Sequence, residues 1–505
     1  MATIKQSSNP QILSIKRFRP SKATHDDLLS ATLSDRARYI YSPAFRRLQM
    51  KAQVFSLENN AAVRSRLTHS MEVAHIGIFI VQKITEIIKG KLDSHSNVSP
   101  QESYIYENAQ AIRNVVETAC LIHDVGNPPF GHFGESAISS WFSDNKKELS
   151  KAHGVAEEEL HDYEDFLNFD GNPQGLRIVT KLQGHDGFGL NLTTSQIASI
   201  IKYTASNKDI DGTILHKKKM GYFSTEEALV KDVWSELGID ERGKRHPLVY
   251  IMEAADDISY CISDIEDGIE KGIVSYEKFF VFLKNKLDFN FRERNSDHDI
   301  HLGKVLTEIE KSYKLSMDAL TRSEDNKSLA ENFILLKTYI TNLSVQEVAE
   351  IFLEDLDSIM TGNSDSIVDK AMSSVGKIQK TLKDFTSKYI FTSEEAEKIE
   401  LSGYSVIYGL MDNFAPLLKM PEDKFRLIIN NNNKEIRKNK LFVHSRLFNL
   451  LPSKHINEYK RTTPDDAGKI VEFNHRCHLI VDYISGMTDG FSVELYQLLT
   501  GIKVK

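Results

Sequence analysis

Helical periodicity runs through nearly all of this 505-residue chain, and it narrows the possible folds more than any other feature. Apolar residues recur at the three- to four-residue spacing of an amphipathic helix, whereas the alternating pattern of a strand is hard to find. The 12 prolines and 26 glycines are about 2% and 5% of the chain, below the usual averages of about 5% and 7%. Few residues therefore break helices, and we predict an all-α fold.

The chain is long enough for one large domain or for two to three smaller ones. Residues 1–34 are polar and basic, and Ser34-Asp35 resembles the opening of a helix. The catalytic domain is predicted over 35–300, and its residues 35–135 carry most of the candidate chemistry. Residues 136–170 are acidic and polar and favour an insertion or a mobile connection, and 171–300 is helical again. Amphipathic helices continue over 301–505. We therefore predict a basic N-terminal segment, a catalytic helical domain and a helical C-terminal region.

Composition indicates a soluble globular protein, with 41% apolar and 27% charged residues. No apolar run approaches the ~18 residues that span a bilayer, and the N-terminus lacks the apolar core of a signal peptide. The three cysteines, Cys120, Cys261 and Cys477, are widely spaced and form no CxxC pair. They are typical of reduced cysteines. We predict a cytoplasmic protein with no membrane partner.

Basic residues gather in two windows of this acidic chain, whose net charge is −8. Residues 1–70 hold 12 Lys and Arg against 4 Asp and Glu, and residues 424–461 hold 10 against 2. Each window therefore has a net charge of about +8, which favours polyanions such as nucleotide phosphates or a nucleic-acid backbone. A solvated charged surface is an equal alternative for either window taken alone.

The densest candidate chemistry lies in one short stretch after a buried helix. The apolar run 115–122 predicts that helix, and His123-Asp124 stand where it ends. A Gly/Pro loop follows, and His132 and Glu135 come directly after it. The first pair could bind a metal while the second pair handles protons, so this stretch is a candidate active site.

Two further residues could complete a metal site with His123 and Asp124. His69 opens a long helical pattern, and Asp256 lies on a third helix. Two imidazoles and two carboxylates suffice for a divalent ion with open positions for water and substrate. Such donors suit Mg²⁺, Mn²⁺, Fe²⁺ and Co²⁺ as well as Zn²⁺, and the sequence does not choose among them.

The helix that carries Asp256 offers more polar groups on the same face. Asp256, Tyr260 and Asp264 are spaced four residues apart, so they drift by only ~40° per step. One residue could hold the metal while the other two face a ligand. The alternative is an ordinary polar helix face.

His132 and Glu135 fit a proton-transfer role. A histidine oriented by a carboxylate is the expected general acid for an alkoxide leaving group, whereas the simpler alternative has His132 capping the next helix. His75 and His161 are more typical of surface or core histidines than of ligands. Phosphate binding must use side chains, since the chain has no GxxxxGK[ST] and no GxGxxG. The candidates are Arg46-Arg47, Arg66, Lys202-Tyr203 and Lys217–Lys219.

Together these motifs resemble the HD-domain superfamily of metal-dependent phosphohydrolases, and within it the bacterial deoxyguanosine triphosphate triphosphohydrolases. The resemblance covers most of the chain, with motifs in order from about residue 35 to 490. They are FRRLQMKAQVF (45–55), RLTHSMEV (66–73), HDVGNPPFGHFGE (123–135), KYT (202–204), EAADDISY (253–260), SRLF (445–448) and DYISGMTD (482–489).

The resemblance implies an all-α HD-domain helical bundle with a large helical C-terminal region. It implies one divalent metal per subunit, Mg²⁺ or Mn²⁺, with Co²⁺, Fe²⁺ or Zn²⁺ as alternatives. It also implies cleavage of dGTP to deoxyguanosine and tripolyphosphate. The implied metal ligands are His69, His123, Asp124 and Asp256, and the implied catalytic pair is His132 with Glu135.

The resemblance further implies contacts to substrate and to partners. Gln53, Tyr260 and Asp264 would surround the deoxyribose, and Arg66, Lys202 and Tyr203 would contact phosphates. Glu400 and the basic residues around Arg437 could complete a base pocket on a neighbouring subunit. The implied assembly is a homo-hexamer, and some relatives bind single-stranded DNA. Where other relatives carry a further active-site histidine, this chain has Asn168-Phe169-Asp170, which leaves His132 as the main proton carrier.

Three functions remain open at this stage. The first is dGTP triphosphohydrolysis. The second is a broader dNTP triphosphohydrolase or another HD nucleotide phosphohydrolase. The third is a single-stranded nucleic-acid-binding regulator with a structural metal. His132 and Glu135 argue against the third, since a structural site needs no spare acid, and Tyr260 with Asp264 favours the first.

Overall fold

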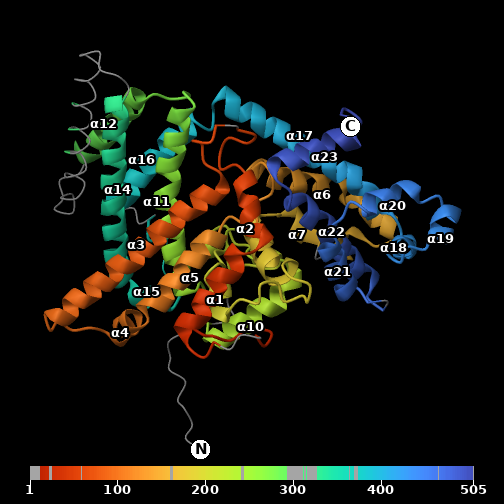
Figure 1. Cartoon of the computed structure of the whole chain (residues 1–505), viewed down its shortest axis with the longest axis horizontal. Coiled ribbons are helices and arrows are strands. Elements are labelled where there is room, and N and C mark those ends of the chain that lie inside the picture. The colour runs from red at the N-terminus through yellow and green to blue at the C-terminus, as the bar shows by residue number, and fades with distance from the viewer. Residues whose placement is uncertain are drawn as a thin grey trace, which may run out of the picture.

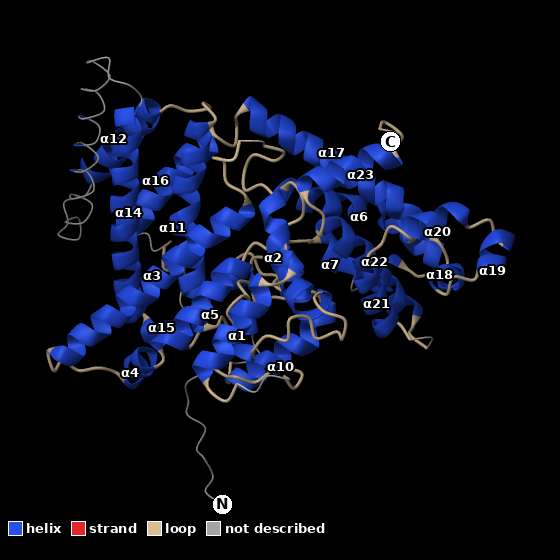
Figure 2. Cartoon of the chain, in the orientation of Figure 1, coloured by secondary structure: helices blue, strands red, loops and turns tan. Residues whose placement is uncertain are grey.

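The computed structural model is built from helices and loops (Figure 2). It describes residues 12–21, 25–58, 60–159, 163–239, 244–292, 327–362, 366–368, 374–464 and 466–503, and the single residues 307, 311, 314 and 364. Within these residues extended pairing is limited to two isolated bridges, Ala52 with Ser65 and Ala205 with Met220. The prediction of an all-α fold is confirmed.

The largest hydrophobic core surrounds the helices that hold the candidate site. α3 and α5 cross at its centre, and their buried faces carry Ile80, Ile84, Val115 and Val116. The first half of α11 and the second half of α14 close this core. Its helices are α1 (Leu28–Ile40), α2 (Pro43–Arg47), α3 (Arg66–Asp93), α4 (Pro100–Glu107), α5 (Ala109–Ile122), α9 (Thr194–Ala198), α10 (Glu227–Leu237), α11 (Pro247–Glu270), α14 (Lys327–Glu354) and α15 (Leu356–Met360).

A smaller core joins the second half of α11 to the first half of α14 and to two more helices, α12 (Tyr276–Arg292) and α16 (Ser374–Tyr389). Phe279, Phe333 and Phe385 meet in it edge to face. Because α11 and α14 each contribute to both cores, the two bodies are continuous.

A third core gathers the C-terminal helices around α6 and α17. Figure 1 shows α12, α14 and α16 at one end of the molecule and α18 to α21 at the other, with α2 and α5 between them. The helices around this core are α6 (Gly131–His153), α7 (Glu164–Leu167), α17 (Glu394–Lys419), α18 (Glu422–Ile429), α19 (Asn433–Lys438), α20 (Phe442–Phe448), α21 (Ser453–Thr462), α22 (Lys469–Ser485) and α23 (Asp489–Leu499). The short helix α8 (Gly171–Arg177) contributes Leu176 to the largest core instead.

Two local predictions need correction, and a third falls on a residue that the structure does not describe. The first helix does not open at Ser34-Asp35, because the Asp27 side chain caps α1 seven residues earlier than Ser34 by accepting from the backbone N–H of Ser30. Within the predicted insertion or connection 136–170, residues 136–153 form the greater part of α6, whose buried face carries Trp141. His161 lies outside the described residues.

The predicted domain division stays a prediction, and its boundary at residue 300 lies outside the described residues. Cys120 and Cys477 are free and buried, and the Cys261 side chain lies outside what the structure describes. In the described part of the chain, no helix combines the length and the apolar character needed to cross a membrane.

Candidate active site

The first wall of the candidate site is the start of α3. Ser65 caps this helix in a reciprocal box with Thr68, each side chain accepting from the other's backbone N–H. His69 follows one turn into the helix, with its side chain fully buried. A helix capped in this way begins at a fixed residue, so the direction of the His69 imidazole is fixed with it.

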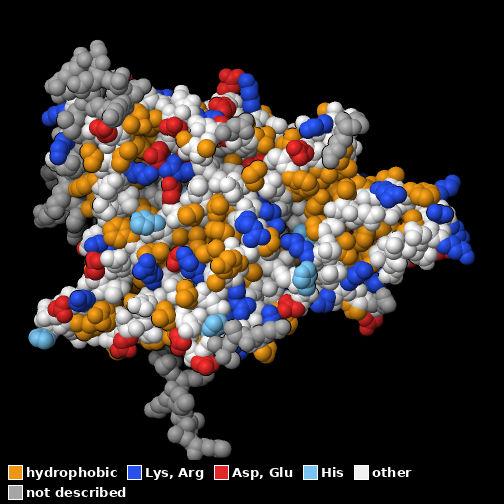
Figure 3. All heavy atoms as spheres, in the orientation of Figure 1, with side chains coloured by type: hydrophobic (Ala, Val, Ile, Leu, Met, Phe, Trp, Pro, Cys, Tyr) orange, Lys and Arg blue, Asp and Glu red, His pale blue; other side chains and the backbone are white. Residues whose placement is uncertain are grey.

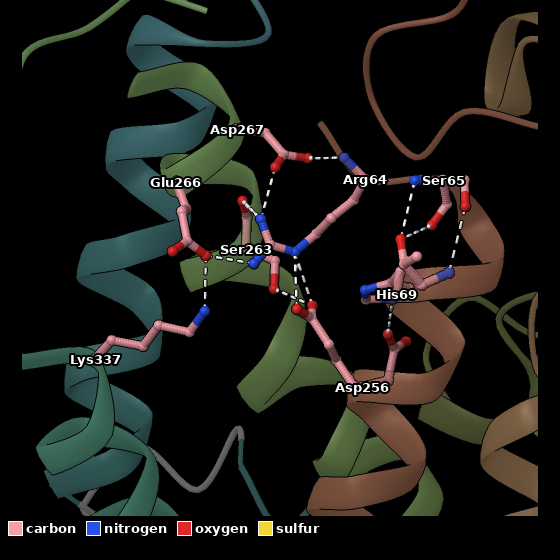
Figure 4. A network of polar contacts seen from close by, with 10 residues as sticks. Arg64, Ser65, His69, Asp256, Ser263, Glu266, Asp267 and Lys337 are labelled. Atoms are coloured by element: carbon pink, nitrogen blue, oxygen red, sulfur yellow. Dashed lines mark hydrogen bonds and ion pairs between the residues drawn. The ribbon is translucent and has the colours of Figure 1, made fainter. Parts of the chain in front are cut away.

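An ion-pair network holds the start of α3 against α11 and α14 (Figure 4). Arg64 donates to Asp267 over 2.6 Å, to Glu72 over 2.8 Å and to Glu266. Lys337 of α14 donates to the same Glu266 over 2.7 Å. The guanidinium therefore joins the start of α3 to α11, and Glu266 links α14 to this network through Lys337. Beside this network, His69 faces Asp256 of α11 (Figure 4).

The second wall is the end of α5. His123 is the C-terminal cap of this helix, and its Nδ1–H donates to the carbonyl of Cys120 over 2.6 Å. That bond assigns the proton to Nδ1 and leaves the lone pair of Nε2 free. The Nε2 atom is buried and has no hydrogen-bond partner among the described residues. A buried, unpartnered imidazole nitrogen of fixed tautomer is the donor that a metal ion requires.

Three of the four predicted metal ligands meet at one point. His69 Nε2 lies 3.3 Å from Asp256 Oδ1, and His123 Nε2 lies 3.5 Å from the same oxygen. One ligand atom from each of the three lies within 4.8 Å of the others. Burial opposes ionisation of Asp256, but His123, His69 and Lys202 outweigh it and hold the pKa of this carboxyl well below its usual range. The cluster therefore presents two imidazole nitrogens and one carboxylate, a donor set that fits a divalent cation.

Asp124 lies beside this cluster, and its two carboxylate oxygens have different neighbours. Its Oδ1 lies 3.7 Å from His123 Nε2 and accepts from the Asn127 amide over 2.6 Å, while its Oδ2 accepts from Arg66 over 2.7 Å. Burial works against ionisation, yet Arg66 and the two imidazoles lower the pKa of Asp124 to about 2. Asp124 is therefore a carboxylate within reach of the metal cluster and directly bonded to a predicted phosphate-binding arginine.

The loop after Asp124 is shaped by close packing on α8. A Cβ on Gly126 would lie 2.0 Å from the carbonyl oxygen of Gly171, so a larger residue would push the loop away. Phe130 then takes a left-handed conformation, with φ of 61°, as the N-cap of α6. His132 is therefore not the cap of the next helix, and the simpler interpretation of this residue is wrong.

His132 and Glu135 form a hydrogen-bonded pair at the start of α6. The Nδ1–H of His132 donates to Glu135 Oε2 over 2.7 Å, and Glu135 Oε1 accepts from the backbone N–H of Gly171 over 2.7 Å. The His132 side chain is 83% exposed, whereas that of Glu135 is 10% exposed. The hydrogen bond to Glu135 raises the pKa of His132 above its ordinary value, although the charges of Lys219 and Arg66 oppose this. The imidazole is thus held at one nitrogen and accessible at the other.

Two of the three predicted sugar-binding residues, Tyr260 and Asp264, lie close to His69. Asp256, Tyr260 and Asp264 all lie on α11, and the Tyr260 ring meets that of His69 edge to face with centroids 6.5 Å apart. Burial raises the pKa of Asp264 to about 8, and His69 and Tyr260 offset this only in part. Gln53 carries a buried side-chain oxygen with no hydrogen-bond partner among the described residues.

Three of the predicted phosphate-binding residues each lie beside a carboxylate of the protein. Arg66 is bonded to Asp124. Lys202 lies 3.7 Å from Glu253, and after the cost of burial this carboxylate and Asp256 raise the pKa of Lys202 above its ordinary value. Lys219 donates to Asp170 over 2.7 Å. Its positive charge acts to lower the pKa of His132.

Other candidates lie elsewhere. Tyr203 is buried. Arg46 is exposed and donates to the carbonyl of Tyr41. His75 is exposed on α3, as predicted.

Sequence analysis missed two residues that join the loop to the C-terminal helices. Lys51 is buried and donates from Nζ to the carbonyls of Asn127 over 2.5 Å and Ser485 over 2.9 Å. Asp489 accepts from the backbone N–H of Ala52 over 3.0 Å and of Phe130 over 3.3 Å. Both residues lie in motifs on which the resemblance rests, 45–55 and 482–489. Those motifs do not indicate which distant residues they contact.

A buried charge network continues this connection. Arg177 of α8 donates to both oxygens of Asp482 on α22 over 2.9 to 3.1 Å and to Glu226 over 3.0 Å. Gln174 donates to the same Asp482 over 3.0 Å. The helix that supports Glu135 through Gly171 is therefore fastened to the C-terminal region.

Comparison with known proteins decides the family. The HD-domain model matches residues 66–231. A probable deoxyguanosinetriphosphate triphosphohydrolase of Pseudomonas aeruginosa is 36% identical over 492 residues, which cover 94% of each chain. The deoxyguanosinetriphosphate triphosphohydrolase of Klebsiella pneumoniae subsp. pneumoniae is 35% identical over 528 residues and 97% of each chain. The chain belongs to the deoxyguanosinetriphosphate triphosphohydrolase family.

Membership of this family confirms the resemblance drawn from the motifs, and it makes the chain a metal-dependent triphosphohydrolase. The Yersinia enterocolitica member is 34% identical over 527 residues, which cover 97% of this chain and 98% of that one. The HD match contains His69, His123 and the His132 pair, whereas Asp256 lies beyond it on α11. The family's HD domain implies a divalent metal, and the cluster of His69, His123 and Asp256 could hold it.

Proposed function

We propose that the protein hydrolyses dGTP to deoxyguanosine and tripolyphosphate at one divalent metal ion. The relatives named above carry the name of this activity. The observation that supports it most directly is His132, whose Nδ1 is held by Glu135 while the rest of the imidazole is exposed. A site that only held a metal for stability would need no such acid.

The proposed metal ligands are His69, His123, Asp124 and Asp256, with Mg²⁺ or Mn²⁺ as the expected ion and Co²⁺, Fe²⁺ or Zn²⁺ as alternatives. When bound, the ion would neutralise phosphate charge and lower the pKa of a bound water. The protein holds the ligands in place beforehand, since Cys120 fixes the His123 tautomer and Arg66 keeps Asp124 ionised.

His132 acts as the general acid in this proposal. Water attacks the α-phosphorus, the bond between phosphorus and the 5′ oxygen breaks, and the proton on His132 Nε2 passes to that leaving oxygen. The attacking water releases a proton to solvent, and His132 takes up a proton from solvent before the next turnover. Glu135 stabilises the protonated imidazole before transfer, because its carboxylate accepts the Nδ1–H. Gly171 fixes the second oxygen of Glu135, so the pair approaches the substrate in one orientation.

The remaining predicted residues would bind the substrate. Gln53, Tyr260 and Asp264 would surround the deoxyribose, where a close-packed Tyr260 ring would exclude a ribose 2′-hydroxyl. Gln53 brings a buried oxygen that needs a donor, and a sugar hydroxyl would supply one. Arg66, Lys202 and Tyr203 would contact the phosphates, with Arg66 linking them to Asp124.

One experiment distinguishes the candidate functions. Purified protein with Mn²⁺ is incubated with each dNTP and each rNTP in turn, and the products are separated by chromatography. Deoxyguanosine and tripolyphosphate from dGTP alone support the proposal, whereas equal turnover of all four dNTPs supports the broader triphosphohydrolase. Monophosphate with pyrophosphate would indicate a different HD nucleotide phosphohydrolase. No turnover would favour a nucleic-acid-binding regulator with a structural metal.

We also propose that the chain assembles as a homo-hexamer, works in the cytoplasm and binds single-stranded DNA. Glu400 lies on α17, close enough to His132 for the two charges to interact. Arg437 lies on α19 at the outer end of the C-terminal helices. Light scattering on the purified protein tests the hexamer. A salt titration of DNA binding tests the phosphate contact, because backbone contacts weaken steeply with salt.

A further inference from the structure

A second pocket lies apart from the candidate active site, between α2 and the C-terminal helices. It has a volume of about 350 Å³. Its cations are Arg47 on α2 and Lys454 at the start of α21. Arg47 belongs to the first basic window and Lys454 to the second, so the fold brings the two windows together here. Figure 3 shows Lys and Arg side chains gathered over the middle of this face, where Figure 1 labels α2.

Neither cation is directly bonded to an anionic side chain among the described residues. Within the described part of the chain, the side chains of Arg47 and Lys454 make no hydrogen bond and no ion pair, although both are half-buried. Asp482 also lines the pocket, but both its oxygens are engaged by Arg177. Burial, reinforced by Arg47, lowers the pKa of Lys454 to about 8, although the charge of Asp482 opposes this. Two half-buried like charges that lack a directly bonded anion destabilise a fold unless an anion joins them.

Further groups point to the same kind of ligand. The α21 helix spans 10 residues and no side chain caps its N-terminus, so the free N–H groups beside Lys454 add partial positive charge. The Nε2 of Gln183 and the Nδ1 of His455 are buried without a partner among the described residues, and both side chains line the pocket. Gln183 directly follows a π-helical turn over Ile178–Leu182, a wide turn that is frequent at functional sites.

Most of the remaining pocket lining is apolar, which indicates that the ligand carries an apolar or aromatic group beside its anionic group. Met487, Phe491, Tyr483 and Pro452 face the pocket together with Ile178 and Leu182. A free inorganic anion would leave these side chains unused, and a long nucleic-acid strand would need an extended groove rather than a pocket of this size.

We propose that this pocket binds an organic phosphate of about mononucleotide size. Its phosphate would bridge Arg47 and Lys454 at the start of α21, and its apolar or aromatic body would lie against Phe491 and Tyr483. The site is distinct from the proposed metal centre, and its ligand need not be the substrate.

The test uses the full-length protein in EDTA, so that a metal does not contribute to binding. Adenosine 5′-monophosphate and inorganic phosphate are titrated calorimetrically against the wild type and the single variants Arg47→Met and Lys454→Met. Each variant should weaken adenosine monophosphate binding by about tenfold or more, as expected for a lost charge-assisted contact. Adenosine monophosphate should also bind more tightly than phosphate alone.

The melting temperature of the ligand-free protein gives a second readout, and it should rise in the variants whose binding is weakened. Both methionine variants should melt higher than the wild type, because they remove an uncompensated cation, whereas a purely structural role predicts lower melting. Lys454→Arg should restore binding. Lys434→Met is the matched control, since Lys434 is an exposed cation of the same basic window.

Three outcomes would overturn the proposal. They are the absence of saturable binding by the wild type, affinity that the methionine variants leave unchanged, and lower melting in both variants. Loss of binding to single-stranded DNA without loss of adenosine monophosphate binding would assign the two cations to a strand path instead.

Discussion

The Nδ1 atom of His132 lies 2.7 Å from Oε2 of Glu135. This hydrogen bond holds one ring nitrogen, while the exposed side chain leaves Nε2 accessible. The carboxylate is itself fixed by the Gly171 backbone N–H. Because the pair lies at the start of α6 and Gly171 at the start of α8, the orientation of the proposed proton donor depends on how these two helix starts meet.

His132→Ala should lower kcat by about 10²- to 10⁴-fold, the usual contribution of a general acid. Binding of Mn²⁺ should be unchanged, because the variant leaves His69, His123 and Asp256 in place. Steady-state kinetics and calorimetric Mn²⁺ titration measure the two quantities. Full turnover by the variant would contradict the assignment of His132.

Glu135→Gln should change the pH profile rather than abolish activity. The carboxylate raises the pKa of His132, so the imidazole keeps its proton to higher pH than a free histidine does. Without that charge the pKa falls, and the alkaline limb of the kcat profile should move to lower pH. A profile that does not move would show that another group supplies the proton.

The sequence predicted the parts of the fold that local chemistry controls. The run 115–122 ends at His123 because Gly126 and two prolines follow it, and α5 ends at Ile122. The shared face of Asp256 and Asp264 followed from helical spacing alone, and both lie on α11. The start of α1 was placed too late because the cap at Asp27 looked like part of a polar segment.

Pairings between distant segments could not be predicted in the same way. Lys51 meets the carbonyl of Ser485 across 434 residues, and Asp489 meets Phe130 across 359. These acceptors and donors are backbone atoms, which every residue has, so no side-chain pattern marks them. The bond between Arg66 and Asp124 was also unforeseen, since each residue had been given a separate role.

His123→Ala should remove both metal binding and activity. The variant deletes the buried Nε2 that lies 3.5 Å from Asp256. Mn²⁺ content after dialysis, measured by elemental analysis, should fall to background together with turnover. His75→Ala is the matched control, because His75 is exposed on α3 and outside the cluster. Retained metal in His123→Ala would exclude this imidazole as a ligand.

Lys51→Met should remove a specific pH dependence of stability. Burial lowers the pKa of Lys51 from 10.5 to about 7, so between these values the unfolded chain binds more protons than the folded one. The free energy of unfolding of the wild type should therefore rise with pH above 7, by up to about 1.4 kcal/mol per pH unit from this group. Urea denaturation at pH 7, 8 and 9 should show a flatter dependence in the variant. Parallel curves would mean that Lys51 keeps its ordinary pKa.

Asp489→Ala should weaken catalysis without touching a substrate-binding group. The carboxylate joins the backbone of Ala52, next to Gln53, to that of Phe130, which begins the helix of His132. Its loss leaves two backbone N–H groups without this acceptor, and each unpaired N–H costs about 1–3 kcal/mol where it stays buried. Displacement of the two segments by about 1 Å would lower kcat/KM by about 10²-fold.

The comparison with Asp489→Asn distinguishes positioning from a general loss of stability. The asparagine variant keeps one acceptor oxygen, so it should recover part of kcat/KM while Mn²⁺ affinity stays constant throughout the series. Glu494→Ala, an exposed carboxylate on the same helix, is the control for charge and should behave as the wild type. If Asp489→Ala lowers the melting temperature but leaves both kcat and KM unchanged, the contact supports only the fold. A coupled fall in kcat/KM, partly rescued by asparagine, would make Asp489 the residue through which the C-terminal helices position the active site.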